Sequence, residues 1–238
     1  MKKRTLRNFL VFIFIVILIL ITWYLFFKNI DKANKDEEYI YTKLNREVNI
    51  YGENYNLYEI KFNFESEEQK RVEKELKTIL KEKKTQENYI ETDRCITNVL
   101  DVSGKCLASF YSNEAKVYES KKYISLVVEY EYIDLIKDTE NPLFDSYVYN
   151  FDKKNGDSIN NEDLEKEYDF DIKEEIKKAI INTDNNRTIG HKEIDYKVEE
   201  IIENNSYSLY VNENEELCIL GYVDTVVGIL QIESIIGK

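Results

Sequence analysis

A run of nineteen uncharged residues, Phe9 to Phe27, most strongly limits what this chain can fold into. Its only small polar residue is Thr22. As an α-helix with a rise of about 1.5 Å per residue, the run is roughly 28 Å long and matches the hydrocarbon core of a bilayer. Trp23 and Tyr24 lie near its end, where aromatic rings favour the membrane interface. Residues 9–27 therefore predict a transmembrane helix whose partner is the lipid bilayer.

A cleaved signal peptide is the alternative interpretation of this run. It would have a shorter apolar core of about 7–15 residues and a cleavage site of small residues. The run ends instead in the bulky sequence "TWYLFFKN", which favours an uncleaved signal anchor. The residues before it are basic at four positions and acidic at none: Lys2, Lys3, Arg4 and Arg7. The positive-inside rule therefore predicts a single-pass protein with a cytoplasmic tail (residues 1–8) and an extracellular C-terminal domain.

The part of the chain after the anchor is strongly acidic. It holds all 46 acidic residues and 29 of the 33 lysines and arginines, which gives it a net charge of −17. Such a surface repels nucleic acid, whose phosphates bind basic patches. It attracts cationic proteins or divalent ions, although a solvated surface is the simpler interpretation. The partners that we expect are a cationic secreted protein or a cell-wall component, and no nucleic acid.

Three segments have apolar residues at the spacing of one helical face. Residues 66–84 begin with a capping-box pattern, Ser66 to Gln69. The apolar stripes are Val72, Leu76, Ile79, Leu80; Ile172, Ile176, Ala179, Ile180; and Ile194, Val198, Ile201, Ile202. Because each helix has one apolar stripe, a sheet or another helix must cover it.

Segments of the β type alternate with these helices at irregular intervals. The first are "VNIYG" and "YNLYEIKFNF", and "KYISLVVEYEYIDLI" (residues 122–136) is the longest such run. "SYSLYV", "ELCILGYVD" and "ILQIESI" predict three short antiparallel strands at the end of the chain. The order predicts an α+β fold, a mainly antiparallel sheet packed by about three amphipathic helices. We expect a linker over residues 28–45 and one extracytoplasmic domain over 46–238, with possible halves 46–135 and 136–238.

Residues 146–170 are rich in acidic and amide side chains, as a calcium loop is. An EF-hand loop needs Asp at position 1, oxygen ligands at 3 and 5, and Gly at 6. With Gly156 at position 6, Phe151 falls at position 1, and with Asp152 at position 1, Gly156 falls at position 5. Neither register fits. The segment instead predicts a hairpin with an Asn-Gly turn, followed by a helix that Asn160 or Asn161 caps.

The same segment carries a resemblance to a known family. Asn150, Asp152, Gly156, Asp163 and Leu164 resemble the Asn-x-Asp, Gly and Asp-Leu pattern of the extracytoplasmic domain shared by the anti-sigma factor RsiV and the peptidoglycan deacetylase PdaC. "IKFNFESEEQKRVEKEL" is similar to the opening strand and helix of that family, and "YSLYVNENEELCILGYV" to its late hairpin. The resemblance covers roughly residues 55–235 and implies a membrane-tethered domain of the bacterial cell envelope.

The chain also departs from that family. The segment "DLIKDTENPLFD" lacks the Gly-Gly-Ala-His-like loop that precedes the hairpin there. Eight cytoplasmic residues are too few for a sigma-binding segment, and no metal-dependent deacetylase domain is recognisable. The resemblance therefore implies an RsiV-like ectodomain without a sigma-binding segment.

No catalytic, cofactor-binding or metal-ligating residue stands out, and we expect no cofactor. His191, the only histidine, is expected to be an exposed residue before a helix. Glu199, Glu200 and Glu203 are interpreted as a solvated helix face rather than a metal site. A disulfide between Cys95 and Cys106 is left open, because spacing does not define connectivity, and Cys218 is expected to be a buried thiol.

Two classes of function stay open. The first is a non-enzymatic binding or sensory module of the cell envelope, and the second is a hydrolase of the cell envelope that works through carboxylates. An enzyme is expected to show a concave site lined by close acids with raised pKa values, whereas a module is expected to show a groove or a flat surface.

Overall fold

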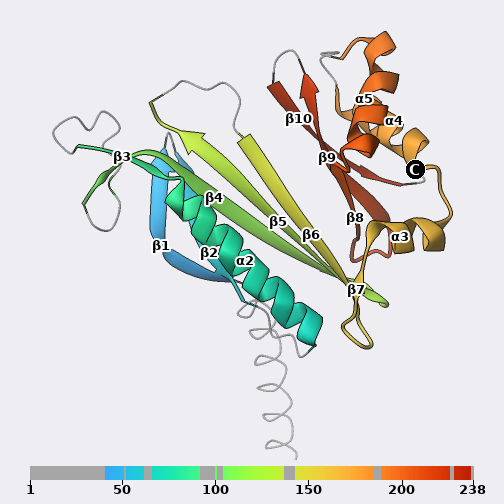
Figure 1. Cartoon of the computed structure of the whole chain (residues 1–238), viewed down its shortest axis with the longest axis horizontal. Helices are drawn as coiled ribbons and strands as arrows, with labels where there is room; N and C mark the ends of the chain where they lie inside the picture. Colours follow the sequence, from blue (N-terminus) through green and yellow to red (C-terminus); the bar gives the residue numbers. More distant parts are fainter. Residues whose placement is uncertain are drawn as a thin grey trace, which may run out of the picture. The chain divides into compact units, whose positions relative to one another are not determined.

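Figure 1 shows the computed structural model of the chain. The structure describes residues 41–50, 52–61, 66–91, 100, 104–136, 143–184, 189–225 and 228–236. The predicted cytoplasmic tail and anchor (residues 1–8 and 9–27) lie outside this part. Within it, no helix is both long enough and apolar enough to span a membrane. Residues 41–238 form one compact unit.

The described part is α+β, and all its paired strands are antiparallel. The strands are β1 (Tyr41–Ile50), β2 (Glu53–Ile60), β3 (Asn88–Ile90), β4 (Cys106–Glu119), β5 (Tyr123–Asp134), β6 (Leu143–Asp152), β7 (Ser158–Ile159), β8 (Tyr207–Val211), β9 (Leu217–Thr225) and β10 (Gly228–Ile235). The helices are α2 (Glu67–Thr85), α3 (Asn161–Tyr168), α4 (Ile172–Thr183) and α5 (His191–Glu203). The α+β class and the antiparallel pairing were predicted correctly. Because β1 begins at Tyr41, regular structure starts before residue 46, where we expected the domain to begin.

The three predicted helices are confirmed as α2, α4 and α5. Ser66 caps α2 in the predicted capping box with Gln69. The apolar stripes face the interior, since Val72, Leu76 and Leu80 of α2 are buried, as are the central apolar residues of α4 and α5.

The described part holds four helices where about three amphipathic helices were expected, since the capped helix after Asn160, α3, is separate from α4. Asp169 ends α3 in the left-handed conformation (φ +48°), which aspartate tolerates better than most residues. Two residues later, the Asp171 side chain accepts hydrogen bonds from the backbone N–H groups of Lys173 and Glu174 and so starts α4. The break is encoded by two aspartates that the apolar spacing does not reveal.

The central sheet has the strand order β3-β4-β5-β6-β7. Its longest strand is β4, with 14 residues, and not the 12-residue β5 that the sequence pattern favoured. β4 mixes charged, polar and apolar residues and was missed for that reason. β6 pairs with β5 from Tyr123↔Asp152 to Tyr132↔Leu143, so strands from both of the possible halves share this sheet.

The C-terminal strands form a separate sheet in the order β10-β9-β8, and β1 pairs with β2 in a third. The antiparallel pairing of the C-terminal strands was predicted, but one sheet was expected where the described part has three. One face of the C-terminal sheet packs against α3, α4 and α5 around Leu209, Ile219 and Ile232. The other face contacts the central sheet through Tyr210, Cys218 and Leu220, which lie against Val127. α2 and β2 cover the opposite face of the central sheet. α2 therefore packs on one face of the central sheet, and the C-terminal sheet contacts the other face around Val127.

Residues 146–170 form the predicted hairpin and capped helix. β6 pairs with β7, and Gly156 in the turn has φ +75°. The Asp152 side chain accepts hydrogen bonds from the backbone N–H groups of Lys154 (2.8 Å) and Asn155 (3.3 Å). Asn160 caps α3 in a reciprocal pair with Asp163. The acidic side chains of this segment thus organise its turn and its helix start.

Candidate functional site

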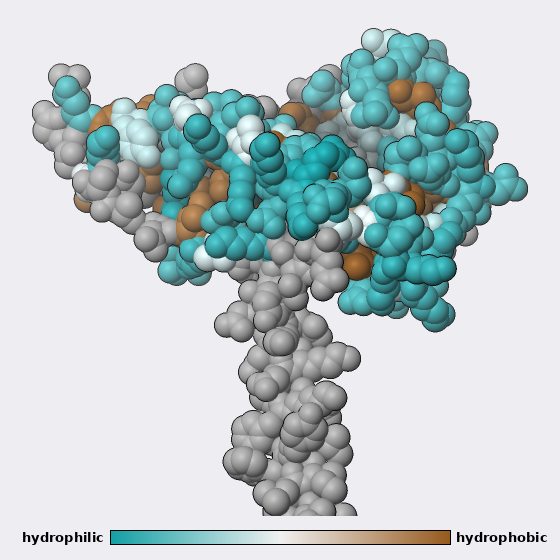
Figure 2. Space-filling model, turned by 60° about the horizontal axis from the view of Figure 1, so that its bottom comes forward, coloured by the Kyte–Doolittle hydropathy of each residue, from teal (hydrophilic) through white to brown (hydrophobic). Residues whose placement is uncertain are grey.

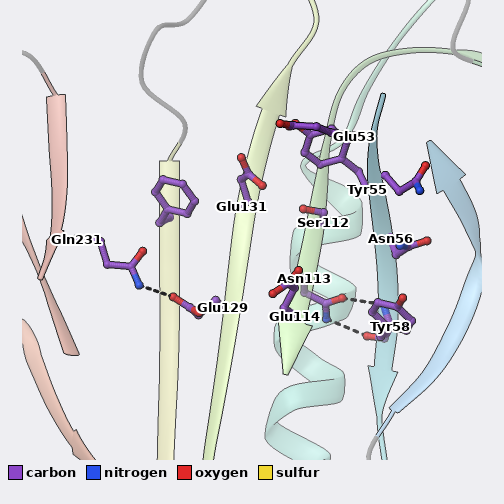
Figure 3. A pocket seen from close by; sticks show the side chains of 12 residues that line it. Glu53, Tyr55, Asn56, Tyr58, Ser112, Asn113, Glu114, Glu129, Glu131 and Gln231 are labelled. Carbon is purple, nitrogen blue, oxygen red and sulfur yellow. Dashed lines mark hydrogen bonds between the residues drawn. The ribbon is translucent and has the colours of Figure 1, made fainter. Parts of the chain in front are cut away.

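The central sheet forms the floor of a groove of about 370 Å³ on the side that faces the C-terminal sheet (Figure 3). β4, β5 and β6 supply the floor, β2 forms one wall, and β10 borders the other side. We call it the acidic groove; its lining residues are Glu53, Asn54, Tyr55, Asn56, Tyr58, Ser112, Asn113, Glu114, Glu129, Glu131, Phe144 and Gln231.

Strand alternation places the acidic residues of the floor. Glu129 and Glu131 on β5 alternate with Val128 and Tyr130, which are fully buried on the other face. In the β4–β5 hairpin, Glu114 lies directly across from Glu129, and Ser112 across from Glu131. Beside the groove, one face of β5 thus belongs to the core while the other presents carboxylates.

The β2 wall is joined to the floor by the side-chain amide of Asn113. This amide accepts a hydrogen bond from the Tyr58 backbone N–H (2.7 Å) and donates one to the Tyr58 carbonyl (2.9 Å). It occupies both backbone groups of one residue, as a neighbouring strand would (Figure 3). The wall is therefore fixed against β4.

The electrostatics of the acidic groove come from four glutamates, and none of its described lining residues is a lysine or arginine. Glu131 is half-buried, and its pKa is raised by burial and then by the charges of Glu53 and Glu114. Tyr55 donates a hydrogen bond to Glu53 (2.9 Å). Burial, this bond and the charge of Glu131 raise the pKa of Tyr55 to about 12. The acidic groove thus concentrates negative charge.

On the far side, Gln231 of β10 donates a hydrogen bond to Glu129 (2.7 Å). In Figure 3 this contact lies on the opposite side of the floor from Tyr55 and Glu53.

Despite the number of acids, no three metal-binding side chains converge closely enough to hold an ion in the described part of the chain. The arrangement suits an extended or multiply charged cationic ligand better than a chelated metal ion.

The residues singled out in the sequence lie elsewhere. Glu199 forms an ion pair with Lys173, and Glu200 one with Lys197, so these two acids are used on the surface of α5. Glu203 is exposed at the end of the same helix. His191 begins α5, and its side chain lies outside what the structure describes.

The cysteines fall into two kinds. Cys106 is disulfide-bonded, which agrees with the bridged alternative, although Cys95 lies outside the described residues. Cys218 is a free, buried thiol, as predicted, and burial raises its pKa to about 11. Its thiol is therefore protonated and unreactive at neutral pH.

Sequence reasoning missed the acidic groove. Glu53, Glu114, Glu129 and Glu131 lie on three strands, and only the strand register brings them together. The one local signal was "VEYEYI", in which two glutamates alternate with core residues.

The face of the molecule drawn in Figure 2 offers little apolar area. Figure 2 shows a mostly hydrophilic face on which apolar side chains form small separate patches. Such patches are normal for a soluble surface and do not indicate an apolar interface. No model of a known protein family matches this chain, and no curated protein matches it either.

Proposed function

We propose that this chain is a membrane-anchored, extracytoplasmic binding or sensory module of a bacterial cell envelope, and that its acidic groove binds a cationic ligand. In this proposal residues 9–27 hold the α+β domain outside the cytoplasm, where cationic secreted proteins are encountered. The apolar run and the basic residues before it support the anchor and its orientation.

The observation that carries the binding role is the one-sided charge of the acidic groove. Its described lining has four glutamates and no basic side chain, and two of the glutamates, Glu114 and Glu129, face each other across neighbouring strands. Like charges in directly opposite positions are destabilising. A cationic ligand relieves this repulsion, and a concave acidic surface raises its local concentration.

Binding is tested with the full-length protein in nanodiscs of zwitterionic lipid, using a fluorescent lysine-rich peptide as the probe. We expect Glu129→Gln combined with Glu131→Gln to weaken binding by about tenfold, because two charges of the floor are lost. The control combines Glu82→Gln with Glu174→Gln, which removes the same charge from exposed helix positions. If both double variants bind as tightly as the wild type, or weaken equally, the acidic groove is not the binding site.

The anchor has its own test. A reporter fused after Lys238 should be active only outside the cytoplasm, and protease added to wall-stripped cells should remove the domain. Reporter activity in the cytoplasm would reverse the proposed orientation. A mature chain that begins after residue 27 would favour the signal peptide instead.

A carboxylate-dependent hydrolase of the cell envelope is the second candidate, and Glu131 favours it. A half-buried carboxyl group with a raised pKa is the property that a general acid needs. Release of soluble fragments from cell-wall polymers by the wild type, lost in Glu131→Gln, would support this candidate. Absence of release under conditions in which the peptide binds would remove it.

A further inference from the structure

Within the described part of the chain, the outer edge of β10 is an unpaired strand edge. β9 and β10 are paired from Gly228↔Thr225 to Ile235↔Cys218, and the Ile236 N–H donates to the Leu217 carbonyl in the same register. Because hydrogen-bonded pairs alternate along an antiparallel ladder, the even-numbered residues of β10 bond to β9. The odd-numbered residues direct their backbone groups away from β9: Ile229, Gln231, Glu233 and Ile235. No residue in the described ranges pairs with those groups.

The opposite edge of the same sheet is closed by side chains. On β8, the side chain of Asn161 donates to the Tyr207 carbonyl (3.2 Å) and accepts from the Leu209 N–H (3.1 Å). Asn150 donates to the Leu209 carbonyl (2.8 Å), and Ser125 accepts from the Val211 N–H (3.0 Å). Side chains thus take the place of a neighbouring strand along β8. Among the described residues, no side chain does the same along β10.

β10 has few of the usual features that block pairing at an edge. Natural edge strands are protected by bulges, by charged residues, especially lysine, or by proline. β1 has such protection, because its register shifts between Lys43 and Glu47, which form an exposed ion pair there. β10 is continuous in register over eight residues and carries one charge, Glu233.

This edge borders the acidic groove. Gln231, one of the residues with outward backbone groups, lines the groove and contacts Glu129 on its floor. The odd-numbered side chains of β10 face the central sheet, as the packing of Ile235 near Val127 shows. A strand added to β10 would therefore extend the C-terminal sheet across the floor of the groove, toward the wall formed by β2.

We propose that the ligand of the acidic groove is an extended peptide segment with basic side chains, and that it adds as a strand to the outer edge of β10. The inference rests on the proposed function and specifies the mode of recognition. Main-chain hydrogen bonds to β10 would provide affinity, as in other cases of strand addition. Since side chains alternate along a strand, every second side chain of the peptide faces the glutamates of the floor.

Charge decides against a second copy of this chain as the occupant. Pairing two β10 edges would bring Glu233 and the floor acids of both copies together, in a protein of net charge −13. Like charges at an interface are costly. A basic peptide is attracted instead of repelled, because each of its lysine or arginine side chains is attracted to the glutamates of the floor.

The test uses an alternating lysine–threonine peptide of about eight residues, a normal strand length, with the full-length protein in zwitterionic nanodiscs. Two further peptides carry backbone N-methyl groups on one or the other alternate set of residues. A strand bound by one edge uses the N–H groups of one set only. We therefore expect methylation of one set to weaken binding by about tenfold or more, and methylation of the other set to change it by about twofold or less.

Equal binding of all three peptides would overturn strand addition while leaving the proposed function intact. Equal weakening by the two methylated peptides would also overturn it, since the expected periodicity would be missing. If the unmethylated peptide fails to bind, the proposed function fails with it.

A substitution in the protein gives an independent check. Gln231→Pro removes an outward N–H without breaking the β9 ladder, because proline is tolerated on an edge whose N–H faces away from the sheet. Gln231→Ala is the matched control, as it removes the same side chain and keeps the N–H. We expect Gln231→Pro to bind the peptide about tenfold more weakly than Gln231→Ala. Equal affinities in the two variants would contradict main-chain recognition at this position.

Discussion

Beside the acidic groove, the two faces of the central sheet are built from the same strands and have opposite chemistry. On the face toward α2, Leu126, Val128 and Tyr130 are fully buried in a continuous apolar core. On the other face, Glu129 and Glu131 line the floor of the acidic groove. Because successive residues of a strand point to opposite faces, one alternating sequence serves both purposes.

The difference separates what stabilises the domain from what is available for binding. The α2 face is covered by side chains from α2 and β2, so substitutions there should lower stability. The groove face is left uncovered between β2 and β10, and its charges repel each other. Substitutions of the groove glutamates should change ligand binding while leaving the fold intact or slightly stabilised.

The largest effect on stability is expected on the α2 face of the central sheet. Leu76 of α2 is 2% exposed within the core, and Leu76→Ala should lower the free energy of unfolding by about 2–5 kcal/mol, because it leaves a cavity. Glu114→Gln on the groove face should change it by about 0.5 kcal/mol or less. Chemical denaturation of the two variants measures both values. Similar losses would mean that the groove face is as important for stability as the core.

The next effect concerns the contact that fixes α2 to the β6–β7 turn. Ser66 donates its hydroxyl to the Gly156 carbonyl (2.9 Å), and a Cβ at Gly156 would lie 2.6 Å from the Ser66 Cβ. Gly156→Ala should lower the free energy of unfolding by about 1–3 kcal/mol. Gly52→Ala is the control, since Gly52 also has positive φ but has open space around it. If the two variants lose the same stability, the close approach to Ser66 is not important.

A smaller, pH-dependent effect is expected in the acidic groove. Because the pKa of Glu131 is raised in the folded state, the folded protein keeps this proton at pH values where the unfolded chain has lost it. Stability is therefore lost as the pH rises from about 4.5, the ordinary value, through the raised pKa. At a pH near the ordinary pKa of a glutamate, the Glu131→Gln variant should have about the same melting temperature as the wild type. At neutral pH, its melting temperature should be higher than that of the wild type. A difference in melting temperature between the two proteins that does not change with pH would contradict the burial and repulsion described for Glu131.

The smallest effect is expected at the turn that resembles a calcium loop. The Asp152 carboxylate is occupied by backbone N–H groups, and Asp157 accepts from the Asn155 side chain (2.6 Å). We expect superimposable thermal melts with calcium and with chelator. A rise in melting temperature with calcium that disappears in Asp152→Ala would show that the turn binds the ion.

Much of the structure on the α2 face of the central sheet was predictable from sequence. The stripe of Val72, Leu76 and Leu80, the Ser66 cap and the Asn-Gly turn are local patterns, and local patterns define local structure. The C-terminal strands followed from short apolar runs for the same reason.

The groove face was not predictable, because it depends on contacts between distant residues. In a chain with 46 acidic residues, nothing marks Glu53 and Glu131 as neighbours until the β1–β2 hairpin is placed beside β4. That placement relies on Asn113, whose amide binds the Tyr58 backbone 55 residues away. Side-chain contacts of this kind have no sequence signature.

Residue-resolved amide hydrogen exchange of β10, with and without the alternating lysine–threonine peptide, tests the account most directly. Exchange reports which backbone N–H groups become hydrogen-bonded. The account predicts that the peptide slows exchange at the outward residues Ile229, Gln231 and Glu233, and leaves the β9-bonded residues between them nearly unchanged. A peptide that binds without slowing exchange at these three positions, or that slows inward and outward residues alike, would contradict it.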